Sequence, residues 1–351
     1  LTLTASQRNF DDYDFPGMAE SDRLHALEEA EEGEEHEEEA HSSGTLENSF
    51  VDTQTYAGGL SWIGENAFLG VAVRRTESQY GLPGSSHEHA EEDHEDEEEH
   101  EDEEEHEEEH EEELPFIDLE QTRYDLRGGI SINNGFLTDL TVTASKADYT
   151  HTEFEGPGEP GTVFESEGIE GRIEVGHVLG PLEGEVGLQY ADTSLERVEL
   201  ANRDAGKVDF DLFSASAGIH KHWDSGWFVG AQASWAERAP NQSELFADGP
   251  HLATVQYELG DATLGKERGL NLEGTARWES ESMSFGVNLF VTDFADFIYL
   301  AATGAELDEL PVFAFSQQDA KFTGGEAFAE YQLLQGPLQA DWKFDAGLDF
   351  V

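Results

Sequence analysis

The sequence predicts an all-β fold, a transmembrane antiparallel β-barrel with short turns at one rim and long connections at the other. Three observations carry this prediction. Apolar and polar residues alternate with a period of two along most of the chain. The alternating runs are about 10 to 15 residues long, against about 5 or 6 for ordinary strands. Tight turns also alternate strictly with long polar connections, as in outer-membrane barrels.

The turns and connections can be assigned in chain order from Gly, Asn, Asp, Ser and Pro clusters. The runs TQTYAGGLSWI and AFLGVAVRRTESQ flank a short GEN turn at residues 64–66. Further short turns are predicted at residues 132–136, 179–184, 223–226, 280–282 and 333–338. Long connections are predicted within EFEGPGEPGT, at residues 153–162, and at about 196–208, 238–268 and 299–316.

This pattern gives about 13 strands, an odd number that a closed bacterial barrel does not have, so we interpret the chain as part of a barrel. The alternative is a soluble β-sandwich or propeller, whose strands are shorter. Sandwich strands also seldom carry apolar outer faces on consecutive hairpins, such as Phe285, Val287 and Leu289. Aromatic residues near strand ends, such as Trp62, Trp227 and those at 294–299, are expected to form interfacial girdles.

Composition limits the partners. The chain has 351 residues, 18 Lys and Arg against 79 Asp and Glu, and a formal net charge of -61. Nucleic acid and anionic lipid surfaces would repel such a chain, whereas cations would be attracted. Cysteine is absent, so any metal site must use His, carboxylate or carbonyl ligands. No run of about 18 apolar residues exists, which excludes a transmembrane helix.

Two low-complexity tracts hold 31 of the 79 acids. The predicted strand order places them in two long loops on the outward side, residues 20–48 and residues 84–116. They have almost no apolar residues to bury, and their dense like charge opposes a helix, so we expect disorder in the absence of metal. Eight of their histidines are candidate metal ligands, namely His87, His89, His94, His100, His106, His110, His36 and His41.

Histidine is concentrated on the outward side, where the predicted phase places 11 of the 14. Imidazole binds borderline first-row ions such as Zn²⁺, and carboxylates neutralise their charge. The histidine spacings in the second tract are 2, 5, 6, 6 and 4, which fit shifting weak sites better than one fixed geometry. The alternative is a solvated acidic loop that shields the surface or binds Ca²⁺, in which histidine is incidental.

Two other positions are candidates for an ordered metal site. His251 follows a Gly-Pro turn and lies near Glu244, Asp248 and Glu258 in sequence, and His151 lies two residues from Glu153 on the same strand face. Ligands from different loops would close a site over the barrel mouth. The alternative is that each histidine is only solvated. No catalytic motif accompanies them, so no enzyme is predicted.

One run resembles a known family. WAERAPNQSELFADGPHLATVQYELGDATLGKERGLNLEGTARW, residues 235–278, resembles the barrel of TonB-dependent outer-membrane receptors, with a RAP-x-x-x-EL-[FY]-A-x-GPH-x-AT pattern before an E-x-G-[DN]-x-x-L-x-x-E pattern. FPGMAES, YGLPGSSHEH, IDLEQTRYDLRG and YTHTEFEG look like the zinc-uptake branch of that family. The resemblance covers essentially all of residues 1–351.

The resemblance implies a barrel of about 22 strands filled by an N-terminal plug. It also implies energy from the TonB-ExbB-ExbD complex and import of zinc across the bacterial outer membrane, with the long loops extracellular. No plug, TonB-interacting segment or final strand is recognised, so we expect a barrel segment. In this branch a zinc site above the plug is shared with barrel loops, and His251, then Glu153 and His151, match its barrel side by motif position.

The sequence therefore predicts a receptor segment for uptake of a divalent transition metal, with zinc the first expectation, in which the two tracts capture the ion at the surface. Outer-membrane lipid and the energising complex are the expected partners, and no prosthetic group is expected. One alternative is a metallophore or haem receptor, whose mouth would be lined by aromatic residues or Arg. The other is an adhesin or metal-sequestering protein anchored by its barrel.

Overall fold

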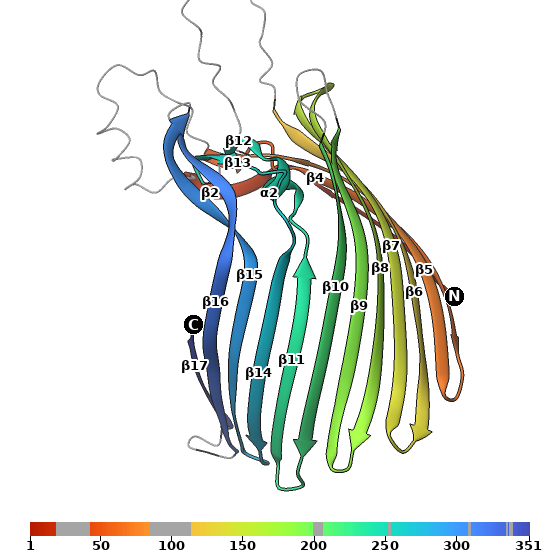
Figure 1. Cartoon of the computed structure of the whole chain (residues 1–351). Coiled ribbons are helices and arrows are strands. Elements are labelled where there is room, and N and C mark those ends of the chain that lie inside the picture. Colours follow the sequence, from red (N-terminus) through yellow and green to blue (C-terminus); the bar gives the residue numbers. More distant parts are fainter. Residues whose placement is uncertain are drawn as a thin grey trace, which may run out of the picture.

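The computed structural model describes residues 1–18, 43–83, 114–198, 206–251, 254–307, 310–334, 336 and 340–351. Its main feature is one curved sheet, antiparallel except where one short strand pairs in parallel, with short turns along one rim and longer segments along the other (Figure 1). The sheet has 15 strands, two of which, β12 (Asp248–His251) and β13 (Gln256–Leu259), form a hairpin in a connection between wall strands. Thirteen strands remain in the wall, which confirms the predicted number and fold class.

The wall strands follow one another in chain order, apart from the inserted small elements. They are β1 (Thr2–Phe10), β4 (Val51–Ile63), β5 (Ala67–Gly81), β6 (Phe116–Asn134), β7 (Leu137–Gly156), β8 (Glu159–Leu179), β9 (Leu182–Val198), β10 (Gly206–His222), β11 (Trp227–Arg238), β14 (Glu267–Glu279), β15 (Met283–Leu307), β16 (Leu310–Leu333) and β17 (Trp342–Phe350). A second small sheet pairs β2 (Tyr13–Met18) with β3 (Ser43–Leu46). Within the described residues no pairing joins β1 to β17, so this part of the wall is an open arc.

The short turns lie where the sequence predicts them. Residues 64–66 join β4 to β5, residues 223–226 join β10 to β11, and residues 280–282 join β14 to β15. Two predicted long connections are wrong, because the strands continue through them. Only residues 157–158 separate β7 from β8. β15 continues to Leu307, and β16 begins at Leu310. Strand pairing continues along both hairpins, and Thr162 in the first and Val312 in the second are buried.

The outer face of the wall carries the apolar side chains of the alternating pattern. Phe285, Val287 and Leu289 are 38%, 42% and 55% exposed, as expected for side chains that would face lipid. Trp62 and Trp227 are exposed near the short turns, in agreement with a girdle. Phe294 is half-buried, and its ring packs against Phe297 and Phe322, so its place in a girdle stays a prediction.

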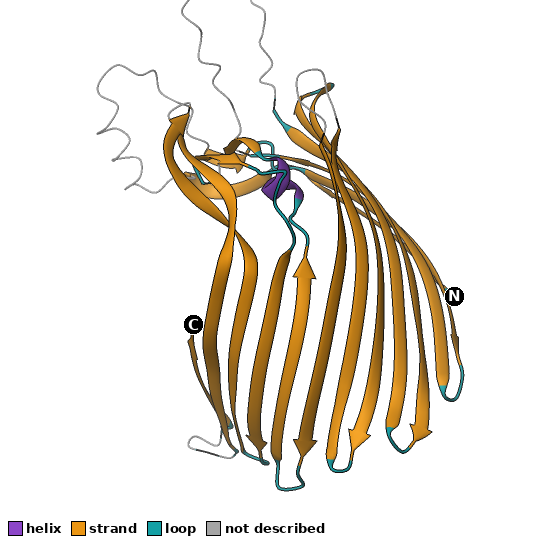
Figure 2. Cartoon of the chain, viewed as in Figure 1, coloured by secondary structure: helices purple, strands orange, loops and turns teal. Residues whose placement is uncertain are grey.

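The largest apolar core among the described residues lies at the loop end of the wall. It joins side chains of β8, β9, β10 and β15 to the connection between β11 and β14, which folds back over the wall (Figures 1 and 2). Its buried members are Phe164, Leu195, Phe210, Leu245, Phe246, Leu264 and Ile298. This connection, residues 239–266, is called the anchored loop below, and its Phe246 ring stacks on Phe164.

Candidate metal site at the loop end of the wall

The anchored loop is fixed by one short helix, α2 (Gln242–Phe246), shown in purple in Figure 2. Asn241 caps the helix through its side chain, which accepts the Glu244 N–H at 2.8 Å, and the Glu244 carboxylate accepts the Asn241 N–H at 2.8 Å. This capping box satisfies two amide donors that a helix start would otherwise leave unpaired. The helix thereby points Leu245 and Phe246 into the core, where they are 2% and 6% exposed.

A shared ion pair joins the loop to the wall. Arg238, the last residue of β11, donates from Nη1 to Glu244 at 2.8 Å and from Nη2 to Glu267 at 3.2 Å. Both carboxylates are buried. Burial alone would lower the pKa of Arg238, but its hydrogen bonds to the two carboxylates outweigh that effect and raise it. The contacts of Arg238 with the two carboxylates hold helix α2 against the start of β14.

The second half of the loop is positioned by its backbone. The Gly260 N–H donates to Ala247 O at 2.7 Å, and the Asp261 N–H donates to Glu244 O at 2.9 Å. A Cβ on Gly260 would lie 2.5 Å from the backbone nitrogen of Phe246, so no larger residue fits there without a shift. Leu264 then enters the core at 6% exposure.

These residues are the fixed positions of the two patterns quoted from residues 235–278, and they have a structural role. Arg238, Glu244 and Glu267 form the ion pair, whereas Gly260 and Leu264 pack the loop. The sequence reasoning missed this network. The sequence feature that could have revealed it is that both quoted patterns specify Arg or Glu at fixed positions, whereas a solvated loop would not require particular charged residues there.

His151 lies beside this core and is the best-formed candidate ligand. It projects from β7 between the rings of Tyr149, at 5.5 Å, and Phe164, at 4.9 Å, and its side chain is 13% exposed. Its Nε2 is 3.7 Å from Glu153 Oε1, so the predicted sharing of one strand face is confirmed. Its Nδ1 is buried without a hydrogen-bond partner among the described residues.

Two tyrosines extend this polar cluster. Burial raises the pKa of Tyr80, and the Glu153 charge adds to the effect. Burial also raises the pKa of Tyr149, with smaller contributions from Tyr80 and Glu153. Both phenols therefore stay neutral near pH 7.

His251 occupies a different setting. It ends β12 and is exposed, and its Nδ1 is 2.9 Å from Thr254 Oγ1. Of its predicted acidic neighbours, Glu244 faces Arg238 instead, and Asp248 accepts a hydrogen bond from Tyr257 at 3.0 Å. Among the described residues no group of three or more His, Asp and Glu has the arrangement of a metal site. The described part of the chain therefore offers a His-carboxylate pair at residues 151 and 153 and a separate histidine at 251.

The other predicted ligands are not placed by the structure. The histidines of the two tracts, His87, His89, His94, His100, His106, His110, His36 and His41, lie outside the described residues. Their metal binding stays a prediction from sequence. None of the helices in the described ranges is long and apolar enough to cross a membrane.

Long alternating strands, short turns at one rim and a folded loop at the other define the class of this protein as an outer-membrane-type β-barrel. Residues 121–351 match the family described as TonB dependent receptor-like, beta-barrel. That match covers more than half of the chain, and the chain belongs to this family. Members are receptors, in agreement with the prediction that the chain is not an enzyme.

Solved structures share the fold at low sequence identity. The ferric citrate transporter FecA in its unliganded form has a TM-score of 0.62 at 10% identity, over 99% of this chain and 49% of that chain. The copper transporter OprC has a TM-score of 0.56 at 15% identity, over 88% and 48%. The siderophore receptor PirA from Pseudomonas aeruginosa has a TM-score of 0.54 at 12% identity, over 87% and 58%. The chain thus spans about half the length of these proteins.

Proposed function

We propose that the chain is the barrel segment of an outer-membrane receptor that imports a divalent transition metal, with zinc as the first expectation. The observation that carries this proposal is His151, which is held between two rings at the loop end with an unpartnered buried nitrogen and the Glu153 carboxylate 3.7 Å away. Imidazole and carboxylate are ligands that Zn²⁺ accepts in tetrahedral sites. Two further ligands would come from outside this pair.

The His/acid tracts support the same proposal from the sequence. They carry nine histidines among 31 acids, a composition that binds borderline divalent ions weakly and at many positions. A charge of -61 also raises the local concentration of cations near the chain. The tracts would collect the ion, and the His151 site would hold it before import. Energy would come from the TonB-ExbB-ExbD complex through a plug that these residues do not include.

A second candidate cargo is a chelated metal, and one observation favours it. The rings of Tyr149 and Phe164 lie on either side of His151. Phe164 also stacks on Phe246, whose ring centroid lies 5.6 Å from the Arg197 guanidinium. Rings and an arginine suit an organic anion better than a bare cation. Proteins of this fold include a copper transporter and a siderophore receptor. The excess of acids in the outward tracts is the argument for the free ion.

Uptake of radioactive zinc tests the proposal. Cells that carry the complete gene are compared with and without a working TonB system, at scarce and at plentiful zinc. Loss of even a group that only orients a metal ligand costs about 10- to 100-fold in affinity, so His151→Ala and Glu153→Gln should reduce uptake at scarce zinc by about tenfold or more. His222→Ala is the matched control, because this exposed histidine lies at the end of β10 by the short turns.

The outcomes separate the alternatives. If zinc uptake is the same with and without a working TonB system while surface binding is intact, TonB-energised transport is contradicted. A sequestering or adhesive barrel is then favoured. Uptake of a ferric chelate, together with unchanged zinc uptake in the His151 variant, would favour the chelated cargo. Deletion of residues 86–113 should weaken uptake at scarce zinc only. Complete loss at both concentrations would show that the tract belongs to the transport site itself.

A further inference from the structure

Three arginines lie close together on the inner face of the wall, opposite the apolar outer face. Arg74 of β5 and Arg123 of β6 are paired in register, and Arg127 lies four residues farther along β6. Val73 belongs to the apolar outer face, so alternation turns Arg74 and its partner Arg123 to the inner face. All three arginines are exposed. Such a basic cluster is contrary to the overall charge of the chain, which has 18 Lys and Arg against 79 Asp and Glu.

Arg74 and Arg123, called the arginine pair below, are like charges placed directly opposite each other. Residues opposed in this way have Cβ atoms about 5 Å apart, and like charges at such positions destabilise the sheet. Asp125 Oδ1 accepts a hydrogen bond from Arg123 Nε at 2.8 Å. Within the described part of the chain, Arg74 has no hydrogen bond or ion pair. An anion between the two guanidinium groups would remove their repulsion.

The side chains beside the arginine pair are small and leave room for an anion. The row of paired residues continues to Ala57 on β4 and to Ala147 on β7, so a single methyl group flanks each arginine. Ala72, two residues before Arg74, lies on the same face. Each guanidinium carries five N–H donors in a planar fork that matches a carboxylate with two parallel hydrogen bonds. Two neighbouring forks can therefore hold one carboxylate between them.

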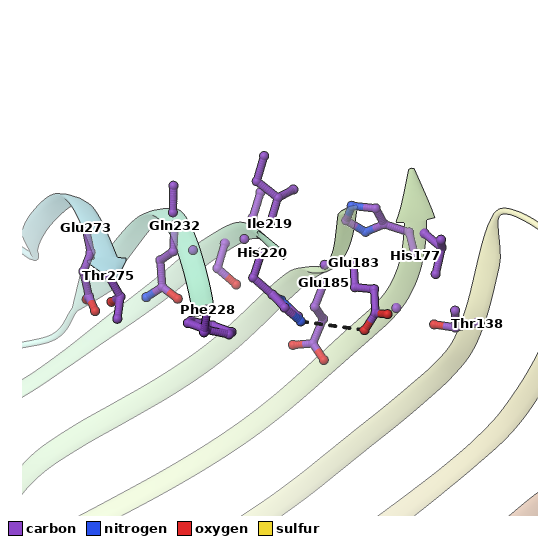
Figure 3. A pocket seen from close by; sticks show the side chains of 18 of the residues that line it. Thr138, His177, Glu183, Glu185, Ile219, His220, Phe228, Gln232, Glu273 and Thr275 are labelled. Atoms are coloured by element: carbon purple, nitrogen blue, oxygen red, sulfur yellow. Dashed lines mark ion pairs between the residues drawn. The ribbon is translucent and has the colours of Figure 1, made fainter. Parts of the chain in front are cut away.

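The inner face is acidic farther round the wall. Glu183 and Glu185 of β9 and Glu273 of β14 also project from this face, as the strand registers require. They line a cavity of about 640 Å³ near the short turns (Figure 3). No lysine or arginine is among the described residues that line it. The arginine pair is therefore a local feature of β5 and β6, to which the field of the inner face directs an anion.

We propose that the arginine pair binds one carboxylate group, with Arg127 adding positive charge. The carboxylate belongs either to a small organic acid inside the barrel or to an acidic side chain of the complete protein outside residues 1–351. The site is separate from the proposed cargo site, because Arg123 faces Ala147, which is four residues, or about 13 Å, from His151 along β7. Its occupancy is measurable without TonB or transport, so failure of the uptake experiment leaves it untouched.

Arginine footprinting with phenylglyoxal tests the proposal residue by residue. Outer-membrane vesicles from cells that express the complete protein are labelled with and without succinate, a dicarboxylate, and the modification of each arginine is read by peptide mass spectrometry. A ligand at ten times its dissociation constant leaves about one site in eleven free, so labelling of Arg74 and Arg123 should slow about tenfold. Arg172 is the control. It lies on the same face with Nη2 2.6 Å from Glu174 Oε1, and its labelling should be unchanged.

A variant tests whether the two arginines share one anion. Arg123→Gln removes one guanidinium and keeps a polar side chain at an exposed position, which the wall tolerates. It should raise the succinate concentration that protects Arg74 by about tenfold or more, because charged hydrogen bonds are lost. Arg172→Gln, on the same face, should leave that concentration unchanged. Unchanged labelling of Arg172 in Arg123→Gln shows that the wall still folds.

The outcomes separate the two sources of the carboxylate. Slowing of both arginines only when succinate is present would assign a small organic acid. Slow labelling of both without succinate, with faster labelling of Arg74 in Arg123→Gln, would assign a side chain of the complete protein. Three results would each overturn the proposal: rapid labelling with and without succinate, equal slowing at Arg172, or protection of Arg74 that is unchanged in Arg123→Gln.

Discussion

The anchoring of the loop by Leu245 yields the sharpest test of the structure. Leu245 is 2% exposed and packs in the core that joins helix α2 to the wall. Leu245→Ala removes three carbon groups, worth about 0.8 kcal/mol each in transfer free energy, and leaves a cavity, so the docked loop should lose roughly 3 kcal/mol. Because each 1.4 kcal/mol is a factor of ten, the undocked population should rise by about 100-fold.

Amide hydrogen exchange measures that population directly. The amides of Leu245, Gly260 and Asp261 donate within the loop, so their exchange should accelerate by about 100-fold while amides of β5 to β9 stay protected. Ser243→Ala, at an exposed position of the same helix, is the control and should change exchange by less than about threefold. Unchanged exchange in Leu245→Ala, or equal acceleration across the wall, would refute the docking argument.

Two further perturbations address the same end of the wall. Gly260→Ala places a Cβ 2.5 Å from the Phe246 backbone nitrogen and should cost about 1 to 3 kcal/mol in urea unfolding, whereas Gly249→Ala, with no atom within 4 Å of the added Cβ, should cost little. Burial would raise the pKa of Glu237, but hydrogen bonds, chiefly from Lys266 at 2.7 Å, outweigh it and lower that pKa below 4.5. Its stabilisation is therefore full above the unfolded value and disappears as pH falls through the lowered one. The difference in melting temperature between the native chain and Glu237→Gln should vanish at acid pH; a constant difference would contradict this.

The wall could be predicted from sequence because its determinants are local. Alternation in a strand places Val287 and Leu289 on one face independently of distant residues. The turn at residues 64–66 is determined by three adjacent residues. The error at residues 153–162 and 299–316 has a physical cause. Gly and Pro residues in both segments look like turn residues in the sequence, while the backbone keeps the ladder and buries Thr162 and Val312.

The site was harder to predict because its contacts are long-range. The near neighbours of His251 in sequence suggested a ligand group, but Glu244 instead pairs with Arg238 and is buried. His151 contacts Phe164 across the paired strands β7 and β8. The sequence periodicity predicts the strand face of His151 but does not predict that Phe164 is its neighbour. Sequence therefore identified the candidate histidines, whereas their neighbours required the fold.

The residues of the run at 235–278 that fix the anchored loop differ from the proposed ligands His151 and Glu153, which belong to the YTHTEFEG motif. Arg238, Glu244 and Gly260, which carry the resemblance, are used up in the ion pair and the packing of the anchored loop. They hold the loop over the wall for whatever cargo a barrel of this fold receives. His151 and Glu153 lie outside that network, with a free ring nitrogen and a half-exposed carboxylate. His151 packs on Phe164, a member of the core that anchors the loop, so His151→Ala also perturbs that core, whereas Glu153→Gln keeps the shape of its side chain. Glu153→Gln is therefore the variant that separates the loss of a proposed ligand from damage to the anchored loop.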